Sequence, residues 1–413
     1  MITASDRPGS PAWRTAEAER LLSFGARAAL DEGGFGYLDD EGEVDQARPR
    51  ELYITARMTH VFSLASMGGG GLPHLGQLAA HGVNALTGLF HDDDHAGWFH
   101  SVGPDGQPQD DAKTNYDHSF VLLAASSALA ADVPGASGLL AAAQQVIVDR
   151  FWRDSEGSCV ESYNRDWSTL EDYRGANSNM HAVEAFMACA DVTGELVWRD
   201  RALSIAERII HVATIANGWR MPEHFDSGWN PDLEYNAHQK ADPFRPYGST
   251  PGHWLEWARL LIGLDRGSSR SLPWLTHAAT RLLEEAEKAG WAADGRPGFV
   301  YTLDWQDSVV VDARMHWVIA EAVLAADAVF RATGDRRARD NADLWWREID
   351  ARFVDRERGS WIHEVDPNGN QSHVTWSGKP DVYHAYQAVL FPDLPLAPSA
   401  AAALRAARIA GAD

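Results

Sequence analysis

The sequence predicts an all-α protein built as a single (α/α)6 barrel, a closed ring of six helix pairs. One observation is a spacing: histidines recur at intervals of 58, 63, 72, 63 and 68 residues, each before an apolar run. They are His60, His118, His181, His253, His316 and His384. A fixed period of this length marks a repeated structural unit. A second observation is that amphipathic segments alternate with these runs, so each unit is large enough for two helices.

The helices are predicted in the following order. Residues 11–31 form a first amphipathic helix that ends before Gly33 and Gly34. The inner helices begin near residues 55, 115, 178, 252, 312 and 381. The outer helices cover residues 73–90, 137–153, 197–215, 272–290, 336–353 and 396–410. Because no linker rich in Pro, Gly or Ser divides the chain, residues 1–413 are predicted to form one domain.

The connections are uneven in length. Those from an outer to an inner helix are long, covering residues 91–114, 154–177, 216–249, 291–311 and 355–380, whereas the return connections are short. Turns such as Asp105-Gly106 and Asn368-Gly369 predict short β-hairpins in the long loops. Helix-capping residues precede the histidines, which places each at or near a helix start. We therefore expect the histidines and the long loops at one rim, around a pocket ringed by imidazoles.

Composition limits the possible partners. The net charge is −23, from 36 Lys and Arg against 59 Asp and Glu, which disfavours nucleic acid and anionic membranes. No run reaches the roughly 18 apolar residues of a membrane span, and the stretch from Met1 to Arg14 is polar. Two cysteines, Cys159 and Cys189, form neither a disulfide framework nor a cysteine metal site. We expect a cytoplasmic monomer or homo-oligomer with a small neutral ligand.

Tryptophan is abundant, with 17 residues. Many are expected on the pocket side: Trp98, Trp167, Trp219, Trp229, Trp254, Trp257, Trp305, Trp317, Trp361 and Trp376. Indole faces suit the C–H faces of a sugar, but large aromatic side chains also fill the core of a helical barrel. For any single tryptophan, packing in the core is the simpler interpretation.

Two histidines have a glutamate three residues later, on the same helix face: His181 with Glu184 and His253 with Glu256. A carboxylate beside an imidazole fixes its tautomer and raises its basicity, as a general base requires. The positive end of a helix dipole acts in the opposite sense and favours the neutral imidazole. Each pair is also compatible with a structural hydrogen bond inside a barrel, and His60, His118 and His316 are equally compatible with packing.

Two arginines and one polar cluster complete the candidates. Arg57 shares a helix with His60, and Arg245 lies in the loop before His253; either is suited to bind sugar hydroxyls or to form a salt bridge. The run from His91 to His95 resembles a metal site, but neighbours in a polar loop converge poorly and a solvated turn fits better. No phosphate-binding glycine loop or nucleophile elbow is present. We expect no metal and no cofactor.

Three motifs resemble the N-acylglucosamine 2-epimerase superfamily. They are Gly175-Ala-Asn177-Ser-Asn-Met-His181-Ala-Val-Glu184, Arg245-Pro-Tyr-Gly-Ser-Thr-Pro-Gly-His253-Trp-Leu-Glu256 and Gly378-Lys-Pro-Asp-Val-Tyr-His384-Ala. The resemblance covers essentially the whole chain and is strongest to the aldose–ketose isomerase branch. It implies the (α/α)6 barrel and metal-free chemistry. One departure is Trp254, where many members carry a smaller residue after the histidine.

The resemblance also implies roles for individual residues. His253 and His384 would be the acid/base pair at sugar C1 and C2, with Glu256 supporting His253. His181 would join this group by holding a substrate oxygen. The remaining substrate-binding residues would be Arg57, Tyr116, Asn177, Arg245, Trp317 and Glu321.

Within this branch, the resemblance implies interconversion of D-mannose and D-fructose through a cis-enediol(ate). A neutral imidazole can remove the proton next to the carbonyl and return it to the neighbouring carbon. Sulfoquinovose isomerisation is an alternative, for which Arg57, Arg245 and Lys379 are candidate sulfonate ligands. A sugar 2-epimerase is another, because it differs only in which face of the enediol is reprotonated.

Two hypotheses belong to other classes. An (α/α)6 glycoside hydrolase would use two carboxylates, for which Asp117, Glu256 and Glu321 are candidates, but that chemistry needs no imidazoles. A non-catalytic sugar-binding protein would bind saturably without turnover.

Overall fold

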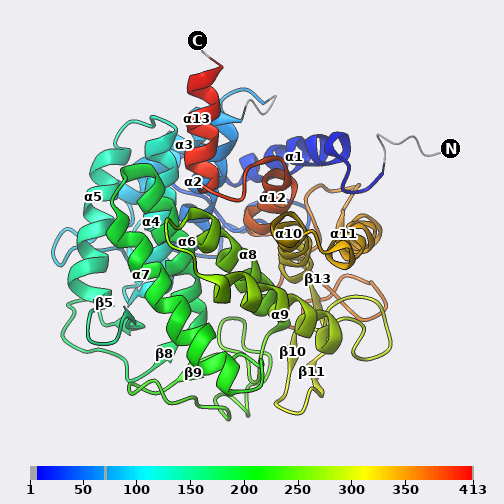
Figure 1. Ribbon diagram of the computed structural model, residues 1–413. Helices are drawn as coiled ribbons and strands as arrows, with labels where there is room; N and C mark the ends of the chain where they lie inside the picture. The colour runs from blue at the N-terminus through cyan, green and yellow to red at the C-terminus, as the bar shows by residue number, and fades with distance from the viewer. Residues whose placement is uncertain (1–6, 69–71, 412–413) are drawn as a thin grey trace. The chain divides into compact units, whose positions relative to one another are not determined.

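The computed structural model of the chain describes residues 7–68 and 72–411, so the first six residues of the predicted polar N-terminal stretch lie outside it (Figure 1). The described residues form thirteen α-helices with short strands between them. They pack as two compact units. Unit 1 comprises the chain up to Leu21, Ala206–Lys379 and His384–Ala397, and unit 2 comprises Leu22–Ile205, Pro380–Tyr383 and the chain from Pro398 onward. The single domain stays a prediction.

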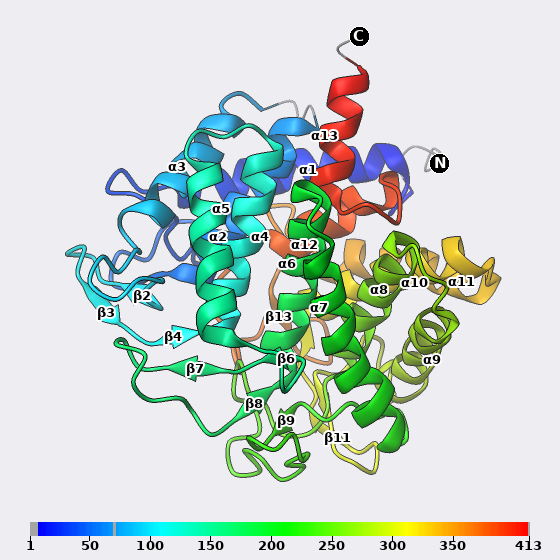
Figure 2. The ribbon, with the colours of Figure 1, turned by 60° about the vertical axis from the view of Figure 1, so that its left-hand side comes forward.

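Unit 2 is built around three inner helices that pack on one another and on two outer helices. The inner helices are α2 (Leu52–Met67), α4 (Asn115–Ala130) and α6 (Ala176–Thr193), and the outer helices are α3 (Leu75–Thr87) and α5 (Ala136–Val146). Every residue of α2 except Ser66 is buried, including the polar residues Thr55, Arg57, Thr59, His60 and Ser63, so this helix lies inside the unit. Helix α13 (Ala400–Ala410) packs against all three inner helices, at the end away from β4 and β7 in Figure 2.

Unit 1 repeats this arrangement. Its inner helices are α8 (Pro251–Gly267), α10 (His316–Thr333) and α12 (Tyr383–Leu390). The first residue of α12, Tyr383, belongs to unit 2, and the rest of that helix belongs to unit 1. Its outer helices are α9 (Pro273–Gly290), which packs on α8, and α11 (Arg336–Glu348), which packs on α10. Helices α1 (Pro11–Gly25) and α7 (Leu196–Ala206) each begin in one unit and end in the other. All predicted helices are therefore present.

Several helix ends differ from those predicted. Helix α10 begins at His316 rather than near residue 312, because strand β12 (Arg314–Met315) occupies the residues before it. Helix α1 ends at Gly25 and is followed by the 3₁₀ turn Ala26–Ala28, short of the predicted residue 31. Three outer helices, α5, α7 and α11, end in π-helical segments. These are Ile147–Phe151, Glu207–Thr214 and Ile349–Phe353.

Short antiparallel strands are present in the long loops. Three pairs are hairpins: β2 (Ser101–Val102) with β3 (Pro108–Asp110), β5 (Trp152–Arg153) with β6 (Ser158–Cys159), and β10 (Thr302–Leu303) with β11 (Val309–Val311). The first contains the predicted Asp105-Gly106 turn, whereas the Asn368-Gly369 turn closes a single bridge between Val365 and Gln371. The other pairs join different loops: β1 (Arg50–Glu51) with β2, β4 (Lys113–Thr114) with β7 (Ser162–Tyr163), and β12 with β13 (Glu364–Val365). Strands β1, β4, β8 (Arg174–Gly175) and β12 each lead directly into an inner helix.

The core is formed by the inner helices and several tryptophans. Trp98, Trp254, Trp257 and Trp361 are buried with at most 1% of their surface exposed, so these four serve packing. Within residues 7–68 and 72–411, every helix is either too short or too polar to cross a bilayer.

Candidate active site

His253 is held by a glutamate from the loop before its own helix. Its Nδ1 lies 2.9 Å from Oε2 of Glu223, which directly precedes β9 (His224–Phe225). The other oxygen of Glu223 accepts the backbone N–H of Thr250, at the start of α8, at 3.0 Å. Because a carboxylate only accepts hydrogen bonds, Nδ1 carries the imidazole proton and the lone pair remains on Nε2. His253 is thereby arranged as a base.

His384 has an equivalent partner on a different helix. Its Nδ1 lies 2.9 Å from Oε1 of Glu321, which belongs to α10 and is fully buried. The second oxygen of Glu321 accepts a hydrogen bond of 2.8 Å from Nε of Arg259. The same argument places the proton of His384 on Nδ1 and its lone pair on Nε2.

Trp317 lies against both of these imidazoles. Its ring centroid is 5.2 Å from that of His253 and 5.8 Å from that of His384, with interplanar angles of 33° and 38°. This approach depends on Gly252, where an added Cβ would lie 2.5 Å from atoms of the Trp317 ring. The two candidate acid/base groups therefore contact one aromatic side chain.

A further imidazole pair adjoins His384. His316 and His363 stack with centroids 3.8 Å apart and an interplanar angle of 23°, and His316 lies 6.4 Å from His384. The backbone N–H of His316 donates to the carbonyl of His363 at 2.9 Å, which fixes the hairpin loop on the start of α10. Unit 1 thus gathers four histidines, of which His363 was not among the predicted residues.

Two features of the second motif lie elsewhere in unit 1. Arg245 donates from Nη1 to the hydroxyl of Tyr235 at 3.2 Å and is partly exposed. Trp254 is fully buried and donates from Nε1 to Oγ of Ser249 at 2.8 Å. Trp254 therefore packs in the core of unit 1.

Unit 2 contains a cation enclosed by aromatic rings. Arg57 donates to Oδ2 of Asp381 at 3.1 Å and to the hydroxyl of Tyr116 at 2.7 Å. Its guanidinium also lies 4.5 Å from the ring centroid of Phe120 and 4.9 Å from that of Tyr383. Burial acts to lower the pKa of Arg57, but Tyr116 and Asp381 outweigh it and the pKa is raised. Arg57 is a permanent cation.

His181 belongs to the same group of side chains. Its ring lies 5.2 Å from that of Tyr116 and 4.6 Å from that of Phe120, so three predicted residues, His181, Tyr116 and Arg57, come together in unit 2. Glu184 accepts a short hydrogen bond from the hydroxyl of Tyr383. Asn177, at the start of α6, has a buried Oδ1 that accepts no hydrogen bond from the residues described here.

The other two repeat histidines serve packing. His60 lies within α2, eight residues after its first residue, and not at a helix start as predicted; its Nδ1 bonds Oγ of Ser127 at 2.7 Å. His118 bonds the carbonyl of Thr114 at 2.7 Å and accepts the backbone N–H of Trp98 at 3.2 Å. Burial lowers the pKa of His118 to about 4, so this imidazole is neutral at physiological pH.

The run from His91 to His95 is a structural turn. Asp92 is buried and bonds Nζ of Lys113 at 3.0 Å and Nε of Arg165 at 2.9 Å. Asp94 also binds Arg165, whereas Asp93 is exposed. Two of the three carboxylates in this run, those of Asp92 and Asp94, are thus bound to cations of the protein itself.

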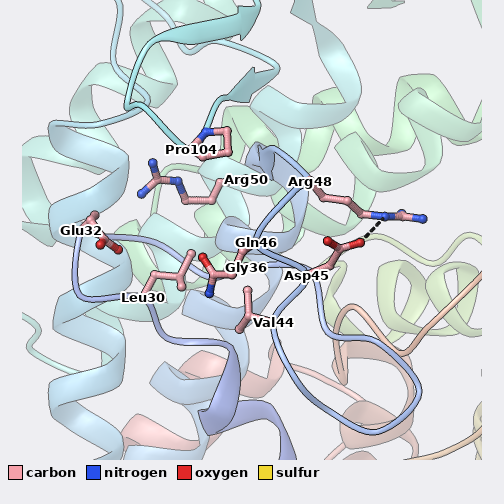
Figure 3. Close-up of a pocket in the computed structure, with 9 residues that line it drawn as sticks. All are labelled: Leu30, Glu32, Gly36, Val44, Asp45, Gln46, Arg48, Arg50 and Pro104. Carbon is pink, nitrogen blue, oxygen red and sulfur yellow. Dashed lines mark ion pairs between the residues drawn. The ribbon is translucent and has the colours of Figure 1, made fainter.

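A separate surface pocket lies in unit 2, near the start of α2 (Figure 3). It is lined by Leu30, Glu32, Gly36, Val44, Asp45, Gln46, Arg48, Arg50 and Pro104. Arg50 donates to the carbonyls of Gly33 and Gly103, and Arg48 forms an ion pair with Asp45. None of the predicted site residues lines this pocket.

The structure changes one predicted role and, besides His363, adds two residues, Glu223 and Arg259. The carboxylate bonded to His253 is Glu223, 30 residues earlier, and not Glu256 as predicted. Glu256 instead lies 3.5 Å from Nη2 of Arg259. The spacing of three residues between His253 and Glu256 favoured the local pair, whereas nothing in the sequence marks a loop glutamate that returns to the helix start. Arg259 was missed because it reads as an ordinary helix charge.

Comparison with known proteins identifies the family of this chain. The sequence matches the family of N-acylglucosamine 2-epimerases over residues 33–388, and the chain belongs to this family. It is 49% identical to a D-mannose isomerase of Pseudomonas cannabina pv. alisalensis, over 96% of both chains. It is 48% identical to a D-mannose isomerase of Thermobifida fusca, over 98% of this chain and 99% of the relative.

A solved structure supports the same assignment. The crystal structure of a D-mannose isomerase superposes with a TM-score of 0.86 at 28% identity, over 92% of this chain and 97% of the other. The (α/α)6 barrel predicted from the sequence and the predicted family are therefore both confirmed.

Proposed function

We propose that the protein is an aldose–ketose isomerase that interconverts D-mannose and D-fructose. The observation that carries this proposal is the pair His253–Glu223 and His384–Glu321, two imidazoles that each bond a carboxylate through Nδ1 and lie against one indole. The names of the two full-length relatives, both about half identical to this chain, support the same reaction.

The chemistry proceeds through the open-chain sugar. One imidazole removes the proton from C2 of the aldose, which gives an enediolate with its negative charge on the oxygen at C1. The second imidazole takes the proton of the C2 hydroxyl and passes it to the oxygen at C1, which leaves the negative charge on the oxygen at C2. The first imidazolium then returns its proton to C1, and the carbonyl that forms at C2 gives the ketose. Each carboxylate at Nδ1 stabilises the imidazolium that forms.

We further propose that the polar groups of unit 2 bind sugar oxygens. Arg57 and Tyr116 supply donors, Asn177 supplies an amide and His181 an imidazole. This role rests on the family resemblance, and it is supported by the buried Asn177 Oδ1 and by the packing of His181 on Tyr116. Arg245, partly exposed in its loop, is proposed as a further contact.

The state of the candidate cations favours a neutral sugar over sulfoquinovose. Arg57 is already paired with Asp381, and Lys379 is fully buried against Asp355 at 2.6 Å. A sulfonate would have to compete with these carboxylates. A glycoside hydrolase is disfavoured because it needs two carboxyl groups free to act on the sugar, whereas Glu256 and Glu321 both contact Arg259.

The test is to incubate the protein separately with mannose, glucose, N-acetylglucosamine and sulfoquinovose in D2O and to follow products by NMR. We expect fructose from mannose, with deuterium at C1 of the fructose that forms wherever the proton exchanges with solvent. Conversion of mannose into glucose alone would identify a 2-epimerase, and binding without turnover would identify a sugar-binding protein. The cytoplasmic location stays a prediction.

A further inference from the structure

Arg259 lies between two buried carboxylates. Its Nε donates to Oε2 of Glu321 at 2.8 Å, and its Nη2 lies 3.5 Å from Oε1 of Glu256. The side chains of Glu321 and Glu256 are 0% and 1% exposed, and that of Arg259 is 11% exposed. The guanidinium also lies 5.7 Å from the ring centroid of Phe391. The cation is thus enclosed by the fold and is not a surface charge.

The same carboxylates, together with His384, have the geometry of a cation site. One donor atom each from Glu256, Glu321 and His384 lie within 4.8 Å of one another, and all three residues are buried. Two carboxylates and an imidazole are an ordinary ligand set for a divalent metal. A carboxylate buried this deeply needs a partner of opposite charge when it is ionised, and the guanidinium of Arg259 lies against both.

We propose that Arg259 is a positioning residue that takes the place of a bound metal ion. By holding Oε2 of Glu321, its planar guanidinium fixes the carboxylate so that Oε1 remains on Nδ1 of His384. The proton of His384 then stays on Nδ1 and its lone pair on Nε2. Arg259 therefore acts on the reaction through Glu321 and His384, an effect that rests on the proposed function of His384.

The test is the substitution Arg259→Gln, with Arg259→Lys as the conservative variant. The matched control is Arg266→Gln, seven residues further along α8, where the arginine donates to the carbonyl of Ala332 near the surface. We expect Arg259→Gln to lower kcat by ~10–100-fold, as for the loss of an orienting partner, with KM changed by less than ~3-fold. Arg259→Lys keeps the charge without the planar fork and should lie between, whereas Arg266→Gln should match the parent protein.

Two readouts do not depend on turnover. In ¹⁵N NMR, His384 should show the Nδ1–H tautomer in the parent protein and lose this preference in Arg259→Gln. Mn²⁺ should bind Arg259→Gln at Glu256, Glu321 and His384 and broaden the His384 signals, but leave those of the parent protein unchanged. An Arg259→Gln protein with parental kcat and an unchanged tautomer would overturn the proposal.

The outcomes separate this inference from the proposed function. If the parent protein fails to isomerise mannose while Arg259→Gln still changes the tautomer and gains Mn²⁺ binding, the positioning role stands and the proposed reaction fails. If Arg259→Gln does not fold, the tautomer and Mn²⁺ measurements on the parent protein still test the proposal. An Nε2–H tautomer of His384, or Mn²⁺ bound beside it in the presence of the arginine, contradicts the proposal.

Discussion

His253 and His384 reach the same chemical environment by different routes in the chain. The partner of His253 comes from a loop 30 residues earlier, and the partner of His384 comes from a helix 63 residues earlier. In both cases the carboxylate bonds Nδ1 at 2.9 Å. Equal partners leave the two imidazoles chemically alike, which suits a reaction that must run in both directions.

If both imidazoles transfer protons, His253→Ala and His384→Ala should each lower kcat by at least ~100-fold, the low end for a lost general acid or base. His118→Ala should lower it far less, because that imidazole bonds Thr114 and Trp98 within the fold. Steady-state kinetics on the three variants, with circular dichroism to confirm folding, checks this. Equal and mild losses in all three would leave the repeat histidines as packing residues.

The reassigned partner of His253 can be tested in the same way. In Glu223→Gln, one amide oxygen must serve both the N–H of Thr250 and Nδ1–H of His253, two bonds that the carboxylate accepts on separate oxygens. The amide NH₂ then faces Nδ1 and favours the wrong tautomer, so kcat should fall by at least ~10-fold. The loss should exceed that in Glu256→Gln. A larger effect at Glu256 would restore the predicted local pair.

At the scale of elements, the start of helix α8 sets the position of the indole. Gly252→Ala would place a Cβ 2.5 Å from the Trp317 ring and 2.7 Å from Cγ2 of Val318. The ring must then move away from the imidazoles, and we expect kcat/KM to fall by ~10–100-fold, as for a small misplacement at a site. The control is Gly138→Ala on α5, where the Cβ meets nothing within 4 Å. Parental kcat/KM in Gly252→Ala would show that the Trp317 contact is dispensable.

The start of helix α4 makes stability depend on pH. Asp117 lies 2.6 Å from Nδ1 of His100 and, despite burial, raises the pKa of His100 to about 10. A pKa above the unfolded value of about 6.5 means that the ion pair contributes fully below pH ~6.5. The contribution is lost as pH rises toward 10. Burial raises the pKa of Glu51 to about 7, so this carboxyl group titrates mainly below the range from pH 7 to 10 in which His100 loses its proton.

We therefore expect the parent protein to lose stability between pH 7 and 10 more steeply than His100→Gln. Urea unfolding at several pH values in this range measures the difference in unfolding free energy between the two proteins. Parallel curves would show that the pair does not hold its proton in the folded state.

The local elements were predictable because they follow from local pattern. Apolar spacing predicted the helices, and Asp-Gly and Asn-Gly turns predicted the hairpins. The predicted ranges include the last residues of α5, α7 and α11, but their π-helical form was not predicted, because segments of five to eight residues are too short to show a period of their own. The strand before His316 was missed because its partner, β13, lies about 50 residues further along the chain.

At the scale of the whole molecule, the repeated histidine predicted the fold, and three of the repeat histidines, His253, His316 and His384, lie near one another in unit 1. The interval alone could not separate His253, His316 and His384 from the packing residues His60 and His118. That distinction depends on which carboxylate or ring each imidazole meets, and the partners Glu223, Glu321 and His363 come from other parts of the chain. Long-range contacts of this kind leave no periodic trace in a sequence.

Activity as a whole should survive exhaustive treatment with EDTA. The buried carboxylates Glu256 and Glu321 already have a cation in Arg259, and Asp92 has Lys113 and Arg165. Turnover of mannose before and after chelation and gel filtration checks this expectation. Loss of turnover that a divalent ion restores would contradict a metal-free mechanism.

The contact of Trp317 with His253 and His384 has an optical consequence. An excited indole donates an electron readily to a protonated imidazole and poorly to a neutral one, so the emission of Trp317 depends on the charge of its two neighbours. A proton that reaches either imidazole during turnover should therefore dim this one fluorophore. The intrinsic fluorescence of Trp317 should therefore report the protonation of His253 and His384 during turnover without an added label.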